Sequence, residues 1–321
     1  MKIDTKTITN MEADTGRQSK LLHTLKKIGG NWQLYVLLFP TLAYFFIFKY
    51  VPMYGLQIAF KDFVPVNGIW GSQWVGLDHF TRFFQSYQFW NLLKNTLLIN
   101  FYQLLFSFPI PIIFALMLNQ VTRTRFKKIV QTVTYAPHFI SVVVLVGMLF
   151  IFLSPSNGFI NNIIQLFGGD PIYFMGKASW FRTVYIGSEI WQTTGWSAII
   201  YLAALTSIDP QLHEAAIVDG ASKFQRVRHI DVPGIMPVVM ILLILDIGKF
   251  VSLGFQKVLL MQNTLNISSS EVIQTYVYKT GILSSQFSYA AAIGLFENVI
   301  NFILLIMMNQ FAKKMKQQSL F

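Results

Sequence analysis

The chain has 321 residues, of which 54% are hydrophobic and only 12% are charged. A soluble domain carries charge on about a quarter of its residues, so this composition excludes an ordinary soluble protein and predicts an all-α polytopic membrane protein. The apolar runs are continuous and do not alternate with period two, which argues against a β-barrel. The sequence contains no cysteine, so it has neither disulfides nor a thiolate metal site.

Residues 1–31 are polar and are predicted to form a cytoplasmic tail, because they lack the apolar core and the small-residue cleavage site of a signal peptide. A transmembrane domain is expected over residues 32–310, followed by a basic cytoplasmic tail over residues 311–321. A helix needs roughly 20 apolar residues to cross a bilayer. Six runs of this kind occur, at residues 34–58, 92–118, 130–153, 184–206, 236–260 and 288–309.

The distribution of basic residues predicts the orientation of these spans. Sixteen Lys and Arg residues fall in segments on the side of the N-terminus, whereas five fall in the loops on the other side. Positive residues concentrate in cytoplasmic loops. Both termini and the loop over residues 207–235 are therefore predicted to be cytoplasmic. This distribution accounts for the net charge of +11 without a nucleic-acid partner.

Two of the predicted outer loops are longer than a connection requires. Residues 61–90 contain three tryptophans, and residues 154–183 place Ile160, Ile163 and Ile164 at helical spacing. That spacing predicts a short helix lying at the outer surface. Interfacial anchoring and docking of an external partner are both open roles for these loops.

The cytoplasmic loop between the fourth and fifth runs has strong helix signals. It begins with Asp209-Pro210, an N-cap followed by proline at the first helical position. The helix presents two alanines through which another backbone can come close, and Gly220 can then turn the chain. A second short helix over residues 221–230, ended before Pro233, would complete a compact knob.

This loop reads EAAIVDGASKFQRVRHIDVPGIMP over residues 214–237 and resembles the signature loop of permease subunits of ATP-binding-cassette importers. The resemblance rests on Glu-Ala-Ala, a glycine four residues later, and an isoleucine shortly before Val-Pro, where valine stands in place of the commoner leucine. Residues 35–63, 194–222 and 288–310 are similar to the carbohydrate-uptake branch, in particular to permeases for polysaccharide-derived oligosaccharides. The resemblance therefore covers nearly the whole chain.

The resemblance implies a type I importer permease fold with six transmembrane helices and a cytoplasmic coupling helix. In that family the coupling helix docks on an ATPase subunit, with Glu214 making a polar contact, the alanines allowing close approach and Gly220 turning the chain. The residues expected to couple to the ATPase are Glu214, Ala215, Ala216, Asp219, Gly220, Ala221 and Pro233.

The resemblance also implies the partners: a second related permease, two copies of the ATPase, an extracytoplasmic solute-binding protein and an oligosaccharide, at a bacterial plasma membrane. Pectic or other uronic fragments and xylan fragments are compatible with the basic outer residues. The chain lacks G-x-x-x-x-G-K-[ST]. It is therefore expected to be a transport subunit and not an enzyme, to bind no cofactor itself, and to leave ATP and magnesium to the ATPase.

Polar residues within the predicted spans are candidates for the substrate path, because they are costly in a membrane and usually face a cavity or the bundle interior. Carboxylate, amide and aromatic groups suit a sugar, although helix packing is a second role open to them. Asp246 and Lys249 lie three residues apart and are expected to pair on one helix; pairing of Glu297 with Lys249 is also open. The path candidates are Glu189, Trp191, Gln192, Trp196, Glu297, Asn298 and Asn301.

No catalytic constellation and no metal-ligand motif such as HExxH occurs. A membrane-embedded enzyme would need convergent acids or a metal site, and the carboxylates of this sequence are isolated. Two further functions remain open. The chain could be an importer permease for a solute other than a sugar, or an ion-coupled secondary carrier that uses Asp246, Glu189 or Glu297.

Overall fold

The computed structural model describes residues 30–252 and 254–314. The predicted N-terminal tail lies almost entirely outside the described residues, and so does most of the predicted C-terminal tail. The chain divides into two compact units at Gln57–Ile58. The first unit is a rod of successive helical segments: α2 (Trp32–Phe45), η1 (Phe46–Tyr50), α3 (Val51–Met53) and the start of η2 (Tyr54–Phe60).

The second unit holds the rest of the described chain. It opens with a small antiparallel pair that the all-α prediction did not include, in which β1 (Lys61–Asp62) pairs with β2 (Gln73–Trp74). Its longer helical segments are α5 (Asp78–Phe84), α6 (Phe89–Tyr102), η4 (Gln103–Ser107), α7 (Pro109–Asn119), α8 (Thr124–Tyr135), α9 (Val142–Phe152), α10 (Phe159–Leu166), α11 (Ala178–Thr206), α12 (Pro210–Val218), η6 (Val227–Asp231), α14 (Val232–Ile247), α15 (Phe255–Met261), α17 (Ile273–Tyr278), η7 (Lys279–Leu283) and α18 (Phe287–Lys314). Its shorter helices are η3 (Pro65–Asn67), α4 (Gly68–Gly71), η5 (Ala136–Phe139), α13 (Lys223–Arg226) and α16 (Ile267–Ser270).

Four continuous helices within the described residues are long and apolar enough to cross a membrane: Trp32–Phe60, Phe89–Asn119, Lys223–Ile247 and Phe287–Lys314. A fifth candidate arises if the bent pair Thr124–Phe139 and Val142–Phe152 counts as one span. Length and composition thus support up to five of the six predicted spans. The fourth predicted run corresponds to α11, which has 29 residues but carries several polar side chains among its apolar ones.

Two predicted runs are not single helices. The run over 130–153 bends by 100° between η5 and α9, where Pro137 lies in η5 and the Ser141 hydroxyl caps α9 by accepting from the Val144 amide. The run over 236–260 stops at Ile247, and helix resumes only at Phe255 in α15. In the first run, proline disturbs the regular backbone ladder at Pro137, and the Ser141 cap starts a new helix after the bend.

Three prolines follow π-helical turns. The residues that directly precede Pro52, Pro109 and Pro233 donate their amides to carbonyls five positions earlier, on Phe46, Gln103 and Val227. Proline lacks an amide proton and crowds the carbonyl four residues before it, and a π-turn accommodates the disturbed ladder. The helix expected to end before Pro233 therefore continues through it, from Lys223 to Ile247.

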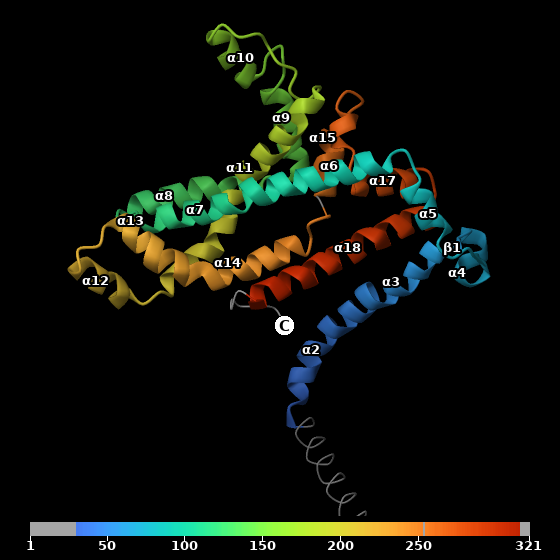
Figure 1. Ribbon diagram of the computed structural model, residues 1–321, viewed down its shortest axis with the longest axis horizontal. Coiled ribbons are helices and arrows are strands. Elements are labelled where there is room, and N and C mark those ends of the chain that lie inside the picture. Colours follow the sequence, from blue (N-terminus) through green and yellow to red (C-terminus); the bar gives the residue numbers. More distant parts are fainter. Residues whose placement is uncertain (1–29, 253, 315–321) are drawn as a thin grey trace, which may run out of the picture. The chain divides into compact units, whose positions relative to one another are not determined.

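Within the second unit, α11 packs along α7 and α8, and α14 lies beside α18 (Figure 1). One apolar core joins α7, α11 and α14 through Ala115, Leu118, Tyr201, Leu205 and Ile235. A second joins α11 with α9 and α15 through Val146, Phe181, Tyr185, Val258 and Met261. Helix α11 therefore serves as the central support from which neighbouring helices are positioned.

The short helix predicted within residues 154–183 is present as α10 and is held by one buried amide side chain. The side chain of Asn161 has no exposed surface. Its Nδ2 donates to the carbonyls of Leu153, Ser154 and Ile172 at 2.8–3.2 Å, and its Oδ1 accepts from the Ile172 amide at 2.7 Å. These bonds fasten both ends of the loop to α10, which lies beyond the end of α9 (Figure 1).

Candidate functional site

A polar cavity of about 300 Å³ lies among α6, η4, α11 and the end of α14. Three side chains on one face of α11 reach it, because Glu189, Thr193 and Ser197 are spaced four residues apart. The opposite wall comes from the helix Phe89–Asn119, which contributes Asn100, Gln103 and Ser107, with hydrophobic Phe108 beside them. Polar groups from helices distant in sequence therefore converge at one place inside the bundle.

Glu189 enters this cavity with its charge already balanced. Its Oε2 lies 2.7 Å from Nζ of Lys257, which belongs to α15 and is only 4% exposed. The same ammonium group lies 4.9 Å from the centre of the Tyr185 ring, within the range of a cation–π contact. A buried charge requires such partners, and the pair ties α15 to the wall of the cavity. Sequence reasoning assigned no role to Lys257.

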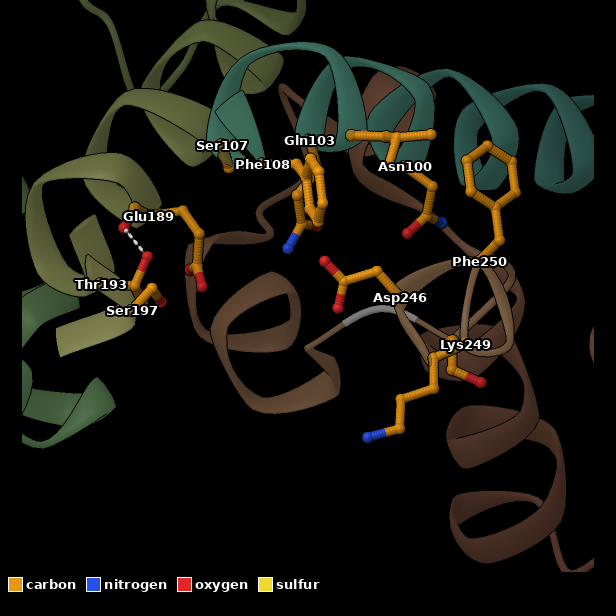
Figure 2. A pocket seen from close by; sticks show the side chains of 12 residues that line it. Asn100, Gln103, Ser107, Phe108, Glu189, Thr193, Ser197, Asp246, Lys249 and Phe250 are labelled. Carbon is orange, nitrogen blue, oxygen red and sulfur yellow. Dashed lines mark hydrogen bonds between the residues drawn. The ribbon is translucent and has the colours of Figure 1, made fainter. Parts of the chain in front are cut away.

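Asp246 and Lys249 also line the cavity, but they do not form the predicted ion pair. Helix α14 ends at Ile247, so the i, i+3 geometry that would bring the two side chains together does not continue to Lys249. Figure 2 shows Asp246 and Gln103 pointing toward one another, whereas the Lys249 side chain points away from Asp246. No carboxylate of the described chain lies within ion-pair distance of Lys249, nor does Glu297 pair with it.

The remaining fourth-span candidates do not line this cavity, but Trp196 lines a smaller one of about 170 Å³ that shares Ser107, Ser197 and Asp246 with it. Gln192 is buried and donates to the Ile140 carbonyl at 2.9 Å. Trp196 stacks on His138 with ring centres 4.5 Å apart and planes within 2°. Both contacts hold the bend between η5 and α9 against α11. Trp191 lines a separate apolar cavity of about 470 Å³, together with residues of α9 and α10 such as Met148 and Phe159.

Two of the three sixth-span candidates hold the segment that follows α14. Glu297 Oε1 accepts hydrogen bonds from Ser252 Oγ at 2.7 Å and from Gln274 Nε2 at 2.8 Å. Asn301 accepts from the Val251 amide at 2.8 Å and donates to Ser252 Oγ at 2.9 Å. Asn298 donates to the Gly294 carbonyl of its own helix. Glu297 and Asn301 thus bond to Ser252, which lines the cavity, whereas none of the three candidates lines the cavity itself.

Sequence reasoning did not select the wall formed by Asn100, Gln103 and Ser107. Their spacing of i, i+3 and i+7 is the same periodic signal that singled out Glu189, Gln192 and Trp196 in the fourth span. Applied to the second span, it would have identified this wall. The described residues contain no cluster of three or more His, Asp or Glu side chains that could hold a metal ion.

The loop over residues 207–235 has the helix start and the glycine turn that its residues predict, but its second helix does not end before Pro233. The Asp209 carboxylate accepts from the Gln211 amide at 2.9 Å at the start of α12. After α12, Gly220 has a φ of +77°, a conformation that favours glycine, and the Ala221 amide donates to the Ala216 carbonyl at 2.9 Å. A capping box between Ser222 and Gln225 then starts α13.

This loop leaves large apolar side chains uncovered. Leu212, Ile217, Val218 and Phe224 are between 54% and 87% exposed, and we refer to these four as the knob surface. Glu214, Ala215 and Asp219 are exposed beside it, and Ala216 is half-buried. Contiguous apolar surface bordered by polar groups is typical of a binding site for another protein.

Comparison with known proteins gives consistent matches. Residues 107–317 match the family described as "Binding-protein-dependent transport system inner membrane component". The chain is 46% identical to "Protein LplB" of Bacillus subtilis (strain 168), over 90% of this chain and 91% of that protein. It is 45% identical to the "Polygalacturonan/rhamnogalacturonan transport system permease protein YteP" of the same organism, over 95% of each chain.

This chain is also similar to chains of solved transporter structures. One chain of a bacterial ABC transporter involved in the import of the acidic polysaccharide alginate aligns with a TM-score of 0.86 and 40% identity, covering 92% of this chain and 100% of that chain. A second alignment has a TM-score of 0.85 and 39% identity, covering 92% and 99%. It is to a bacterial alginate ABC transporter in complex with an alginate pentasaccharide-bound periplasmic protein.

Proposed function

Because this chain belongs to the family of inner membrane components of binding-protein-dependent transport systems, we propose that it forms the translocation path for an oligosaccharide in an ATP-driven importer. The polar cavity is the observation that carries this proposal. It gathers carboxylate, amide, hydroxyl and ammonium groups from helices that are otherwise apolar. Polar residues at membrane depth are expensive unless they face one another or a watery path, and these groups can exchange hydrogen bonds with sugar hydroxyls.

We further propose that the substrate carries carboxylates. The named relatives handle polygalacturonan or rhamnogalacturonan and the acidic polysaccharide alginate. In this chain, Lys249 brings an ammonium group to the cavity, and no carboxylate of the described residues lies within ion-pair distance of it. The carboxylate of Asp246 lines the same cavity and interacts with Lys249 only over a longer distance. A charged donor favours an anionic acceptor over a neutral one, so Lys249 is suited to bind a uronate group. Xylan-derived fragments with uronic side groups fit the same chemistry.

The energy source is proposed to be a separate ATPase in two copies, which binds ATP and magnesium and docks on the knob surface. Exposure of Leu212, Ile217, Val218 and Phe224 beside Glu214 supports this. Within the loop, Gly220 supplies the turn, and Pro233 is the second residue of α14, which follows a π-turn. The proposed coupling set remains Glu214, Ala215, Ala216, Asp219, Gly220, Ala221 and Pro233.

We also propose the number of spans, their orientation and two further partner proteins. We propose six spans, which are the five candidates and α11, with both termini in the cytoplasm; the excess of basic residues on the side of the N-terminus supports this orientation. A second permease would complete the path, and a solute-binding protein would deliver the oligosaccharide to the outer loops. The alignment to a transporter crystallised with its periplasmic protein supports the latter partner.

The proposed function is tested by ATP hydrolysis in liposomes that contain this chain with its second permease, ATPase and binding protein. We expect an oligogalacturonide to stimulate hydrolysis and to accumulate inside the liposomes. Lys249→Gln should raise the half-saturating oligogalacturonide concentration about tenfold, because a hydrogen bond from a charged donor contributes about 1.5 kcal/mol. Lys128→Gln is the matched control, since Lys128 is exposed on α8 and does not line the cavity.

Two results would contradict the proposal. An unchanged half-saturating concentration in Lys249→Gln would remove the carboxylate-binding role of that residue. If no oligosaccharide, acidic or neutral, stimulated ATP hydrolysis in the unaltered complex, the assignment of a saccharide substrate would be wrong.

A further inference from the structure

Asp231 is a carboxylate buried where three elements meet, and its side chain has no exposed surface. Its Oδ2 accepts a hydrogen bond at 3.0 Å from Nε2 of Gln120, the residue that caps the C-terminus of α7. Its Oδ1 lies 3.2 Å from Nε2 of His213 in α12. Asp231 itself directly precedes α14. One side chain therefore contacts the end of one membrane helix, the start of another and the proposed coupling helix.

A charge at this position loses its hydration, which costs free energy. The adjoining core of α7, α11 and α14 contains Leu205 and Ile235 with partly buried Ile208. Packing is close, because a Cβ atom on Gly234 would lie 2.6 Å from Ile208 Cδ1. A carboxylate in such a position must be paired and hydrogen-bonded to be tolerated. The contacts from Gln120 and His213 supply this pairing, and they tie Asp231 to α7 and α12.

Neither member of the His213–Asp231 pair belongs to the signature of the loop. His213 directly precedes Glu214, and Asp231 occupies the unspecified position between Ile230 and Val232. The two residues are 18 positions apart in sequence and meet only because Gly220 turns the chain between them.

The pairing is incomplete in this conformation. Within the described residues, Asp231 Oδ1 has no well-aligned hydrogen bond, although His213 is at ion-pair distance. Nε of Arg226, the other cation that acts on Asp231, is also buried without a described hydrogen-bond partner. Buried polar groups are nearly always satisfied. A small movement of α12 can therefore change the strength of this contact.

From this arrangement we infer that Asp231 is a positioning residue that transmits movement of α12 to two cavity-lining helices. The helix Phe89–Asn119 ends beside Gln120 and carries Gln103 and Ser107 farther along. The helix Lys223–Ile247 contains Asp231 near one end and Asp246 near the other. A displacement of α12 that pulls on Asp231 therefore acts on both walls of the cavity. This inference depends on the proposed function, since the ATPase supplies the displacement.

The test uses the complete complex in liposomes, with Asp231→Asn as the main variant. Asparagine keeps an acceptor oxygen for Gln120 and removes the charge that attracts His213. We expect ATP hydrolysis to continue while the amount of oligogalacturonide imported per ATP falls about tenfold, within the usual range of coupling between sites. Combining His213→Asp with Asp231→His exchanges the partners and should restore most of that ratio. Asp170→Asn, an exposed carboxylate in the outer loop, is the matched control.

A second measurement does not depend on the saccharide. Hydrogen exchange of residues 100–107 and 244–250 is compared with and without nucleotide trapped on the ATPase. We expect these segments to respond in the parent complex, and in Asp231→Asn we expect the response to be confined to residues 210–226. An undiminished response at the cavity in Asp231→Asn would overturn the inference.

The inference would equally be overturned if Asp231→Asn lowered thermal stability but left import per ATP unchanged, because the residue would then have only a structural role. Failure of the proposed function gives a different result. In that case the unaltered complex shows no oligosaccharide-stimulated hydrolysis, whereas hydrogen exchange still reports whether nucleotide changes at α12 reach the cavity through Asp231.

Discussion

At the scale of single residues, the Glu189–Lys257 pair shows how this chain accommodates charge inside apolar helices. The two residues are 68 positions apart, and Lys257 is 4% exposed at 2.7 Å from the carboxylate. Their mutual attraction offsets the loss of hydration of both groups. Glu189 therefore faces the cavity with its charge balanced by Lys257.

We expect Lys257→Met to destabilise the protein, because it leaves the Glu189 carboxylate buried without its cation. Removing one partner of a buried pair costs about 3–5 kcal/mol, so the thermal unfolding midpoint of the detergent-solubilised protein should fall clearly. Adding Glu189→Gln should recover much of the loss. Lys128→Met, at an exposed position, should change stability by at most about 0.5 kcal/mol. Equal midpoints for Lys257→Met and the parent would show that Glu189 is satisfied by other groups.

At the scale of elements, the loop over residues 207–235 depends on a single backbone conformation. Gly220 adopts a φ of +77° between α12 and α13, whereas proline is restricted to a φ near −65°. The turn fixes the direction in which α13 follows α12. It therefore decides which residues form the knob surface.

Gly220→Pro should therefore abolish uptake while the protein still inserts in the membrane, because the turn and not the spans is disrupted. Gly220→Asn is the control, since asparagine tolerates positive φ better than most other residues, and it should retain most of the uptake. Uptake of oligogalacturonide and the amount of protein in isolated membranes are measured together. Full uptake by Gly220→Pro would argue strongly against a coupling role for this loop.

Glu214→Lys tests the same element without changing its backbone. Glu214 is exposed on α12 and has no ion pair within the described residues, so the substitution should leave the fold intact and lower uptake by disturbing the ATPase contact. Co-purification of the ATPase with this chain reports the contact directly. Normal co-purification together with normal uptake would remove Glu214 from the coupling set.

At the scale of the whole molecule, the orientation in the membrane decides whether the knob surface can meet an ATPase. The sequence has no cysteine, so single cysteines can be introduced without a background. In intact cells, a membrane-impermeant maleimide should label Asp170→Cys in the outer loop and should label Val218→Cys in α12 only after permeabilisation. Labelling of Val218→Cys in intact cells would place the proposed coupling helix outside and would reject the importer mechanism.

The features that the sequence determined by itself depend either on a few neighbouring residues or on composition summed over a long run. Apolar run length predicted membrane helices, Asp209-Pro210 predicted the start of α12, and Gly220 predicted the turn that follows it. Each of these depends on neighbouring residues or on average composition. The start of α12 and the turn at Gly220 are present in the structure, and up to five of the six runs form helices long and apolar enough to cross a membrane. The resemblance to importer permeases rested on residues close together in sequence, and the family match confirmed it.

What only the tertiary structure decided are the partners of polar side chains. Asp246 and Lys249 are near in sequence, yet α14 ends between them and they do not pair. Glu189 instead meets Lys257, and Gln120, His213 and Asp231 meet from three different elements. Such contacts depend on where helices end and how they cross. The free energy that selects those arrangements is distributed over whole packed faces, so no short stretch of sequence specifies it.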